Sequence, residues 1–232
     1  MHHYGRVNMR HMSPGDHFVS PQPPYISQFA SKELVSDILD RKRDPATDPK
    51  WTEFWFTSPR DYSFWSWRGC GLIAVKMVLD AYGAADGETM ATLTGRAVDL
   101  GGYKVCDKKG DAVDKGWFYG PLVELAEEFG IDGEVHGALS EEVICRNVID
   151  DRFTVASVHP GVVRGDCDHK PPGADGGHLV LVWGCRWTGS ECAGYYIHNP
   201  SGRVEETQDR AFVPIARFRE AFASRGFSLY RR

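Results

Sequence analysis

The chain of 232 residues is long enough for one sizeable core or two intimately packed lobes, and its 42% hydrophobic and 25% charged residues are typical of a globular protein. A formal net charge of -5 gives no general attraction to nucleic acid or to anionic membranes, and no apolar run approaches the ~20 residues of a membrane helix. The six cysteines include no CxxC pair, which argues against a zinc knuckle or a dense disulfide framework and favours reduced thiols in a cytoplasmic protein.

We expect residues 1–23 to form a partly ordered N-terminal arm and residues 24–232 to form a single domain. The arm lacks the apolar core of a secretory signal peptide. After a short alternating segment, Ser31 is a candidate cap for a helix that ends near Arg41. A turn region rich in Asp and Pro, residues 44–49, separates this helix from the next part of the chain.

Residues 51–67 are dense in aromatic side chains: Trp51, Phe54, Trp55, Phe56, Tyr62, Phe64, Trp65 and Trp67. Such rings can stack on a ligand, and they can equally provide a large apolar surface that covers the neighbouring lobe. We favour the second interpretation.

The sequence from Leu72 to Tyr82 is apolar on almost all sides, which predicts a buried helix over about 70–82 that ends at Gly83. Cys70 therefore falls in the first turn of this helix, between two glycines. Free backbone N–H groups and the helix dipole favour an anion there, so the pKa of a cysteine can fall from ~8.5 towards ~3.5–7.5. The glycines leave room for a backbone or a substrate near the sulfur. The alternative is a small cysteine that only packs at a helix start.

Helices are predicted first and strands second along the remaining chain, which favours an α+β fold with segregated lobes. The predicted helices cover residues 88–100, 119–129, 140–149 and 214–222. The predicted strands cover residues 153–159, 178–185, 194–200 and 227–231. Residues 107–116 and 162–177 are expected to be long loops, and no internal repeat is visible.

Two polar residues stand at strand ends where a sheet can present them to a cleft: His178 opens one predicted strand, and Asn199 ends the next. A thiol nucleophile needs a base within about 2.6–3.2 Å and a third group that orients the base. Cys70, His178 and Asn199 supply these three types of side chain. Taken singly, such a histidine is more often structural and Asn-Pro is more often a turn. His136, His159, His169 and His198 are competing bases, and His159 is the strongest of them.

Four motifs together resemble the peptidase C39-like family of papain-like cysteine hydrolases: Gln28 in Tyr-Ile-Ser-Gln, the Cys70 helix, the Gly-His178 strand and His-Asn199-Pro. The resemblance covers roughly residues 25–199. It implies a papain-like fold in which a helical lobe carrying the cysteine packs on an antiparallel sheet carrying His and Asn. It further implies that Cys70 is the nucleophile, that His178 is the general base and acid, and that Asn199 orients the imidazole through Nδ1–H.

The resemblance also implies that Gln28 helps to form the oxyanion hole with the backbone N–H of Cys70. A lost donor of this kind raises the barrier by about 2.7–4 kcal/mol. The chain departs from the family here, because Gln28 lies 42 residues before the cysteine instead of a handful. This insertion and the two long loops are expected to flank the cleft and to influence substrate choice.

The predicted reaction is attack of Cys70 on an amide or thioester carbonyl, followed by release of the acyl group. Release by water makes a peptidase or amidase, and release by an amine makes an acyltransferase. We expect a stand-alone cytoplasmic enzyme that needs no cofactor and acts on a peptide or a small acylated, possibly carrier-bound, substrate. A binding protein that retains the fold without turnover is an alternative. Metal binding by the loop residues Asp166, Cys167, Asp168 and His169 is a weaker one, since a fourth-ligand pattern is missing.

Overall fold

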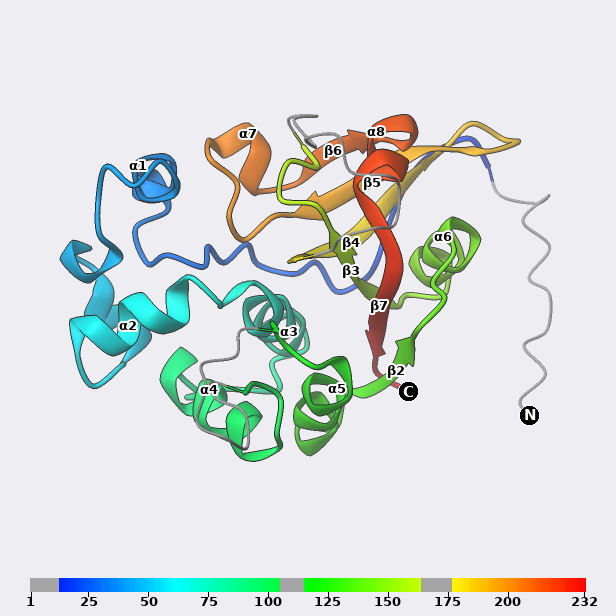
Figure 1. Ribbon diagram of the computed structural model, residues 1–232. Coiled ribbons are helices and arrows are strands. Elements are labelled where there is room, and N and C mark those ends of the chain that lie inside the picture. Colours follow the sequence, from blue (N-terminus) through cyan, green and yellow to red (C-terminus); the bar gives the residue numbers. More distant parts are fainter. Residues whose placement is uncertain (1–12, 105–114, 164–176) are drawn as a thin grey trace.

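The computed structural model describes residues 13–104, 115–163 and 177–232 (Figure 1). The α-helices are α1 (Val35–Leu39), α2 (Pro59–Ser66), α3 (Cys70–Ala81), α4 (Met90–Asp99), α5 (Tyr119–Glu128), α6 (Glu141–Ile149), α7 (Glu205–Gln208) and α8 (Ile215–Ala221). The strands are β1 (Gly15–Phe18), β2 (Asp132–His136), β3 (Phe153–Val158), β4 (His178–Trp187), β5 (Cys192–His198), β6 (Ala211–Pro214) and β7 (Phe222–Tyr230). Short 3-10 helices cover Lys32–Leu34, Pro45–Thr47 and Trp51–Phe54.

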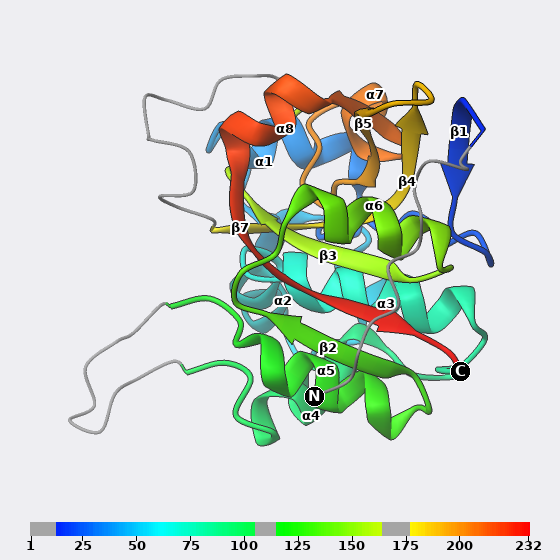
Figure 2. The ribbon, with the colours of Figure 1, turned by 90° about the vertical axis from the view of Figure 1, so that its right-hand side faces the viewer.

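The strands form one seven-stranded sheet in the order β2-β7-β3-β4-β5-β6, and β1 pairs with β4 outside this path. Each of these pairs is antiparallel. Helices α3 and α6 lie on opposite sides of the sheet (Figures 1 and 2). The predicted α+β class is therefore confirmed. Within the described residues, no helix combines the length and the apolarity that crossing a membrane requires.

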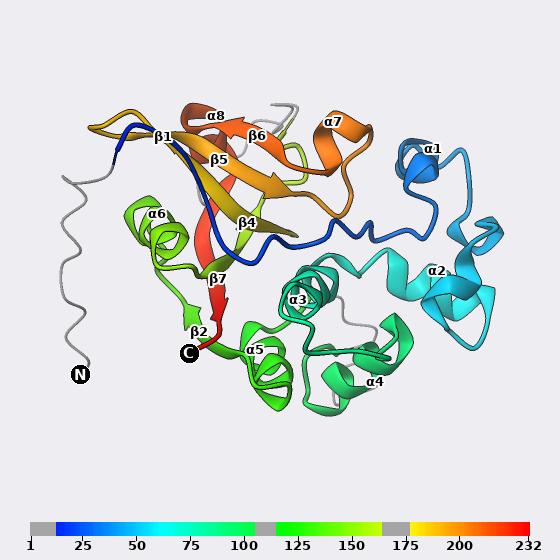
Figure 3. The same ribbon diagram turned by 180° about the vertical axis from the view of Figure 1, so that it is seen from behind.

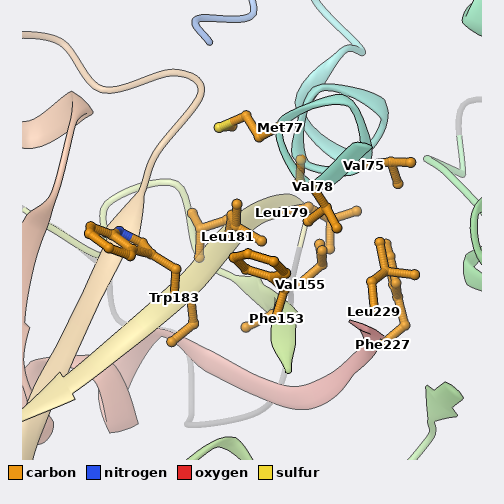
Figure 4. Close-up of a cluster of buried hydrophobic side chains, with 14 of the residues drawn as sticks. Val75, Met77, Val78, Phe153, Val155, Leu179, Leu181, Trp183, Phe227 and Leu229 are labelled. Carbon is orange, nitrogen blue, oxygen red and sulfur yellow. The ribbon is translucent and has the colours of Figure 1, made fainter. Parts of the chain in front are cut away.

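Helix α3 is the centre of the core, as its sequence predicts. Its apolar residues from Leu72 to Leu79 are almost completely buried. In Figure 4, Val75 and Val78 of α3 face a layer of apolar side chains from the sheet: Phe153, Val155, Leu179, Leu181, Phe227 and Leu229. Gly83 adopts a positive φ of 58° and ends the helix, which confirms its predicted role. The first turn of α3 is thus fixed against β3 and β4.

Several elements differ from the sequence-based expectation. The predicted N-terminal arm contributes β1, which pairs with the far end of β4, and the following segment then runs in extended form towards α1 (Figure 3). Strands β2 and β6 are not predicted by the sequence. Strand β7 begins at Phe222, five residues before its predicted start. Ser31 does not cap a helix, because its hydroxyl donates a hydrogen bond to Asp48 instead.

The aromatic segment serves mainly as apolar covering. Tyr62 is fully buried, and Phe54, Phe56 and Trp65 pack against the main core. Trp55 and Phe64 are the exceptions, with 71% and 37% of their surfaces exposed, and Trp55 has a positive φ of 59°.

Candidate active site

The thiol of Cys70 lies where the first turn of α3 meets the start of β4. A β carbon added to the neighbouring Gly71 would lie 2.7 Å from Cδ1 of Leu179, so a glycine is needed for this close approach. The space beside Gly71 is therefore filled by the side chain of Leu179 on β4, while Cys70 itself borders a cavity. The backbone N–H groups of Leu179, Gly71 and Cys70 itself are placed so that they favour the ionised form of the sulfur.

The predicted lowering of the Cys70 pKa is wrong for the free site. Burial raises the pKa of the thiol above its ordinary value, and the three backbone N–H groups only oppose this rise. Desolvation of a thiolate in this packed corner outweighs the favourable end of the helix. The resting side chain is consequently a protonated thiol that has to lose its proton during a reaction.

Three residues of the sheet side form a hydrogen-bonded unit. Nε2 of His178 lies 2.7 Å from Oδ1 of Asn199 and 3.2 Å from Oγ of Ser201. The backbone N–H of Ser201 donates to the same Oδ1 at 3.2 Å, which identifies that atom as the amide oxygen. Since an amide oxygen only accepts, Nε2 of His178 carries the hydrogen and Nδ1 keeps a lone pair. The predicted contact of Asn199 with Nδ1–H is wrong, because the opposite ring nitrogen is held.

His178 is neutral over most of the pH range. Burial lowers its pKa to about 4, and the positive field of His159 acts in the same direction, while the hydrogen bond to Asn199 opposes both. The imidazole is 5% exposed. It is therefore available as a base with its Nδ1 lone pair at any pH well above 4.

A cavity of about 440 Å³ joins the thiol to the imidazole. Cys70, His178 and Leu179 line it together with Ser157 of β3 and Arg225 of β7. Its remaining lining residues are Trp67, Arg68, Tyr103, Lys115, Gly116, Trp117, Phe118, Tyr119 and Gly177. Asn199 and Ser201 line a second cavity of about 150 Å³. Lys115–Gly116 and Gly177, each at the C-terminal end of a predicted loop, border the main cavity, as expected. Val162 and Val163, at the start of the second loop, are also described, and residues 107–114 and 164–176 lie outside the described residues.

Gln28 is brought back to the cysteine despite the long insertion. Its Cβ would lie 3.5 Å from a β carbon at Gly69, and its backbone N–H donates to the carbonyl of Pro200 at 2.8 Å. The side chain is 5% exposed, and its Oε1 has no hydrogen-bond partner in the described part of the chain. Gln28 lines a small separate cavity beside Gly69, not the cavity of Cys70 and His178. Its role in an oxyanion hole remains a prediction.

A buried carboxylate fastens the insertion to the segment that carries Gln28. Asp48 is 1% exposed and accepts hydrogen bonds from the backbone N–H and the hydroxyl of Ser31, from the hydroxyl of Tyr62 and from the backbone N–H of Lys50. Burial alone would raise the pKa of Asp48, but these hydrogen bonds outweigh it and hold the pKa below its ordinary value. The Tyr62 hydroxyl in turn accepts from the N–H of Ala30.

The competing histidines have other partners. His198 is fully buried between the carbonyl of Pro23 and the N–H of Arg210, and His136 contacts the hydroxyl of Ser228. Nδ1 of His159 accepts from the N–H of Gly161. His169 and the suggested metal ligands at 166–168 lie outside the described residues. Among the described residues, no group of three or more His, Cys, Asp or Glu side chains is arranged to hold a metal ion.

Sequence reasoning does not identify Ser201 or Arg225. The Asn199-Pro-Ser sequence indicates only a turn. An asparagine side chain commonly accepts a hydrogen bond from the backbone N–H two residues later, and Ser201 stands at that position. Arg225 precedes the predicted last strand by two residues. It carries no sequence signal that distinguishes it from other surface arginines.

Among known proteins, similarity is found to solved structures. No protein-family model and no curated protein matches the chain. Among solved structures, it is similar to a double glycine motif protease from an AMS/PCAT transporter (14% identity, TM-score 0.41, 70% of this chain and 84% of that one). It is also similar to the peptidase domain of Streptococcus ComA (17%, 0.45, 71% and 93%) and to a putative C39-like peptidase from Bacillus anthracis (18%, 0.47, 71% and 90%).

Proposed function

We propose that this protein is a cysteine hydrolase that cleaves an amide or peptide bond through a thioester acyl-enzyme. The single observation that carries the proposal is the 2.7 Å contact between Nε2 of His178 and Oδ1 of Asn199, from which the tautomer of the imidazole follows. Its Nε2–H is held by Asn199, so a neutral imidazole with a free Nδ1 lone pair borders the cavity that also contains the Cys70 thiol. A neutral base beside a protonated nucleophile is the arrangement that general-base catalysis uses.

Attack and proton transfer are coupled in this mechanism. The sulfur of Cys70 forms a bond to the substrate carbonyl carbon while its proton moves to Nδ1 of His178. The imidazolium that results keeps its Nε2–H bond to Asn199. This partner is neutral, so it orients the ring without the additional charge stabilisation that a carboxylate would give. The imidazolium then donates the proton to the leaving amine as the C–N bond breaks.

The developing oxyanion needs donors near the start of α3. The backbone N–H of Cys70 is one candidate, and the side-chain amide of Gln28 is the other, because the Cβ of Gln28 lies 3.5 Å from where a β carbon at Gly69 would be. Water then attacks the thioester with His178 as the base and releases a carboxylic acid. A cavity of about 440 Å³ has room for an acyl chain and for this water.

Alkylation by iodoacetamide at pH 6, followed by peptide mapping, tests the pair without knowledge of the substrate. Free thiols are mostly protonated at this pH and react slowly. We expect Cys70 to react at least about tenfold faster than glutathione. His178→Ala should lower the rate of this reaction about 10²-fold. His159→Ala is the control: it removes a nearby histidine that acts on the pKa of His178 but takes no part in the proton transfer, so it should change the rate far less than His178→Ala.

Either of two results would reject the enzyme. If Cys70 were labelled only at the rate of glutathione, the alternative of a binding protein that retains the fold would be favoured. An equal loss in His178→Ala and His159→Ala would mean that His178 does not act as the specific base. An amine added to a preformed acyl-enzyme separates hydrolysis from acyl transfer: a hydrolase releases mainly the free acid.

A further inference from the structure

The main cavity carries a charge opposite to that of the whole chain. The formal net charge is -5, yet the charged side chains that line the cavity are Arg68, Lys115 and Arg225. No aspartate or glutamate is found among its described lining residues. Arg68 is engaged by Tyr103 and by the carbonyl of Phe64, and Lys115 is exposed at the rim. Arg225 is therefore the cation that requires an explanation.

A β-bulge directs Arg225 into the cavity. Val158 of β3 pairs with Phe222 of β7, whereas Ala156 pairs with Gly226. Three residues of β7, including Arg225, thus lie opposite the single residue Ser157. Ser157 and Arg225 both line the cavity, so the extra residues bulge on the cavity side. Bulges beside active sites commonly re-aim a side chain in this way.

The bulge is fixed by its surroundings. Ser224 adopts a positive φ of 52°, which is uncommon for a residue other than glycine, and its carbonyl accepts the N–H of Leu139 at 2.8 Å. A β carbon at Gly226 would overlap with the backbone oxygen of Val155, so this position requires glycine. Such local strain held by specific contacts is typical of functional positions.

Arg225 is partly buried, and in the described part of the chain no hydrogen bond, ion pair or ring contact joins its guanidinium to another residue. Partial burial of an unpaired cation is unfavourable unless a counter-charge arrives. A guanidinium presents a planar fork of donors that matches a carboxylate in a bidentate manner.

We propose that Arg225 is a specificity-determining residue that binds a carboxylate of the substrate, so that the enzyme prefers acyl or peptidyl substrates that are anionic near the scissile bond. The proposal rests on the hydrolase function above. His178 on β4 and the Arg225 strand β7 are separated by β3 alone, that is, by two inter-strand spacings or about 10 Å. At ~3.3 Å per extended residue, the carboxylate lies within about three residues of the reacting carbonyl.

Two isosteric probes test this specificity: N-chloroacetyl-Gly-Gly and its C-terminal amide. The Cys70 sulfur displaces chloride from either and forms a thioether, and only the first carries a carboxylate. We expect the wild-type protein to react about tenfold faster with the carboxylate probe, and this ratio to fall to near one in Arg225→Gln. Arg60→Gln makes the same charge change at an exposed position of α2 and should keep the wild-type ratio.

Arg225→Lys, which keeps the charge but loses the fork, should give an intermediate ratio. In the wild-type protein alone, 1 M salt should reduce the ratio. A wild-type ratio near one would overturn the specificity proposal, and so would an unchanged ratio in folded Arg225→Gln and Arg225→Lys. Fast reaction with the neutral probe would in either case still support the hydrolase. Slow reaction of Cys70 with both probes would instead reject the proposed function itself.

Discussion

The two halves of the candidate site are held in different ways. On the sheet side, His178, Asn199 and Ser201 are joined by short hydrogen bonds between strand ends and one turn. On the helix side, Cys70 and Gln28 are 42 residues apart in sequence, and Gln28 comes close to the cysteine through packing at Gly69. The sheet half is therefore specified by local polar contacts, and the helix half depends on how a long excursion is folded back.

One buried carboxylate compensates for this weakness. The insertion between Gln28 and Cys70 contains only short helices, and its own small cluster is formed by Phe29, Val35 and Ile38. Within this insertion, Asp48 links Ser31, three residues after Gln28, to Tyr62 of α2. We infer that the helix half needs a buried polar anchor, because its two residues are separated by a long insertion. The sheet half needs no such anchor.

The largest expected effect comes from removal of that anchor. Asp48→Ala leaves the buried donors of Ser31 and Tyr62 without an acceptor, and each costs ~1–3 kcal/mol; with the part-buried N–H of Lys50, we expect the free energy of unfolding to fall by about 3–5 kcal/mol. Urea denaturation measures this fall. Asp37→Ala removes an exposed carboxylate of the same insertion and serves as the control. A loss below about 1 kcal/mol in Asp48→Ala would mean that packing alone holds the insertion.

Gln28→Ala sharpens the comparison within the helix half. Alkylation by iodoacetamide forms no oxyanion, whereas acylation by a p-nitrophenyl ester does. We therefore expect Gln28→Ala to leave the alkylation of Cys70 unchanged and to slow acylation by about 10²–10³-fold, the effect of one oxyanion donor. The release of p-nitrophenol in the first turnover measures acylation. Equal loss in both reactions would assign Gln28 a structural role, and loss in neither would remove it from the site.

The sequence predicts the parts of this molecule that have strong patterns. Helix α3 and strand β4 are long and continuously apolar, so their burial and the positions of Cys70 and His178 follow directly. Strand β2 escapes prediction because it is partly exposed, with Val135 47% exposed, and therefore lacks an apolar signal. The pKa direction of Cys70 escapes prediction for another reason. A helix start favours a thiolate locally, but the desolvation that reverses this effect comes from tertiary packing against β4.

Acid should weaken the sheet half before the anchor of the insertion. Burial lowers the pKa of both His178 and His198 to about 4, so between ~6.5 and about 4 the unfolded chain binds protons that the folded chain does not. Stability should therefore decrease as the pH falls through this window, by up to ~1.4 kcal/mol per pH unit for each histidine. The pKa of Asp48 is lowered, so its contribution is lost only below ~4.

Urea denaturation at pH 7, 5.5 and 4.5 checks this order of events. The difference in unfolding free energy between wild-type protein and Asp48→Asn should be the same at all three pH values, because Asp48 stays ionised throughout. A wild-type stability that does not change between pH 7 and 4.5 would contradict the buried neutral state of the two histidines.

The smallest expected effect distinguishes the two partners of His178. Ser201→Ala removes a hydroxyl 3.2 Å from Nε2 but keeps the backbone N–H that orients Asn199. We expect Ser201→Ala to slow the alkylation of Cys70 at pH 6 only about threefold, which corresponds to the loss of one neutral hydrogen bond. Asn199→Ala should have an effect at least about ten times larger than that of Ser201→Ala. Ser190→Ala, on the exposed turn between β4 and β5, is the control. If Ser201→Ala were as damaging as Asn199→Ala, the hydroxyl and not the amide oxygen would set the tautomer of the imidazole.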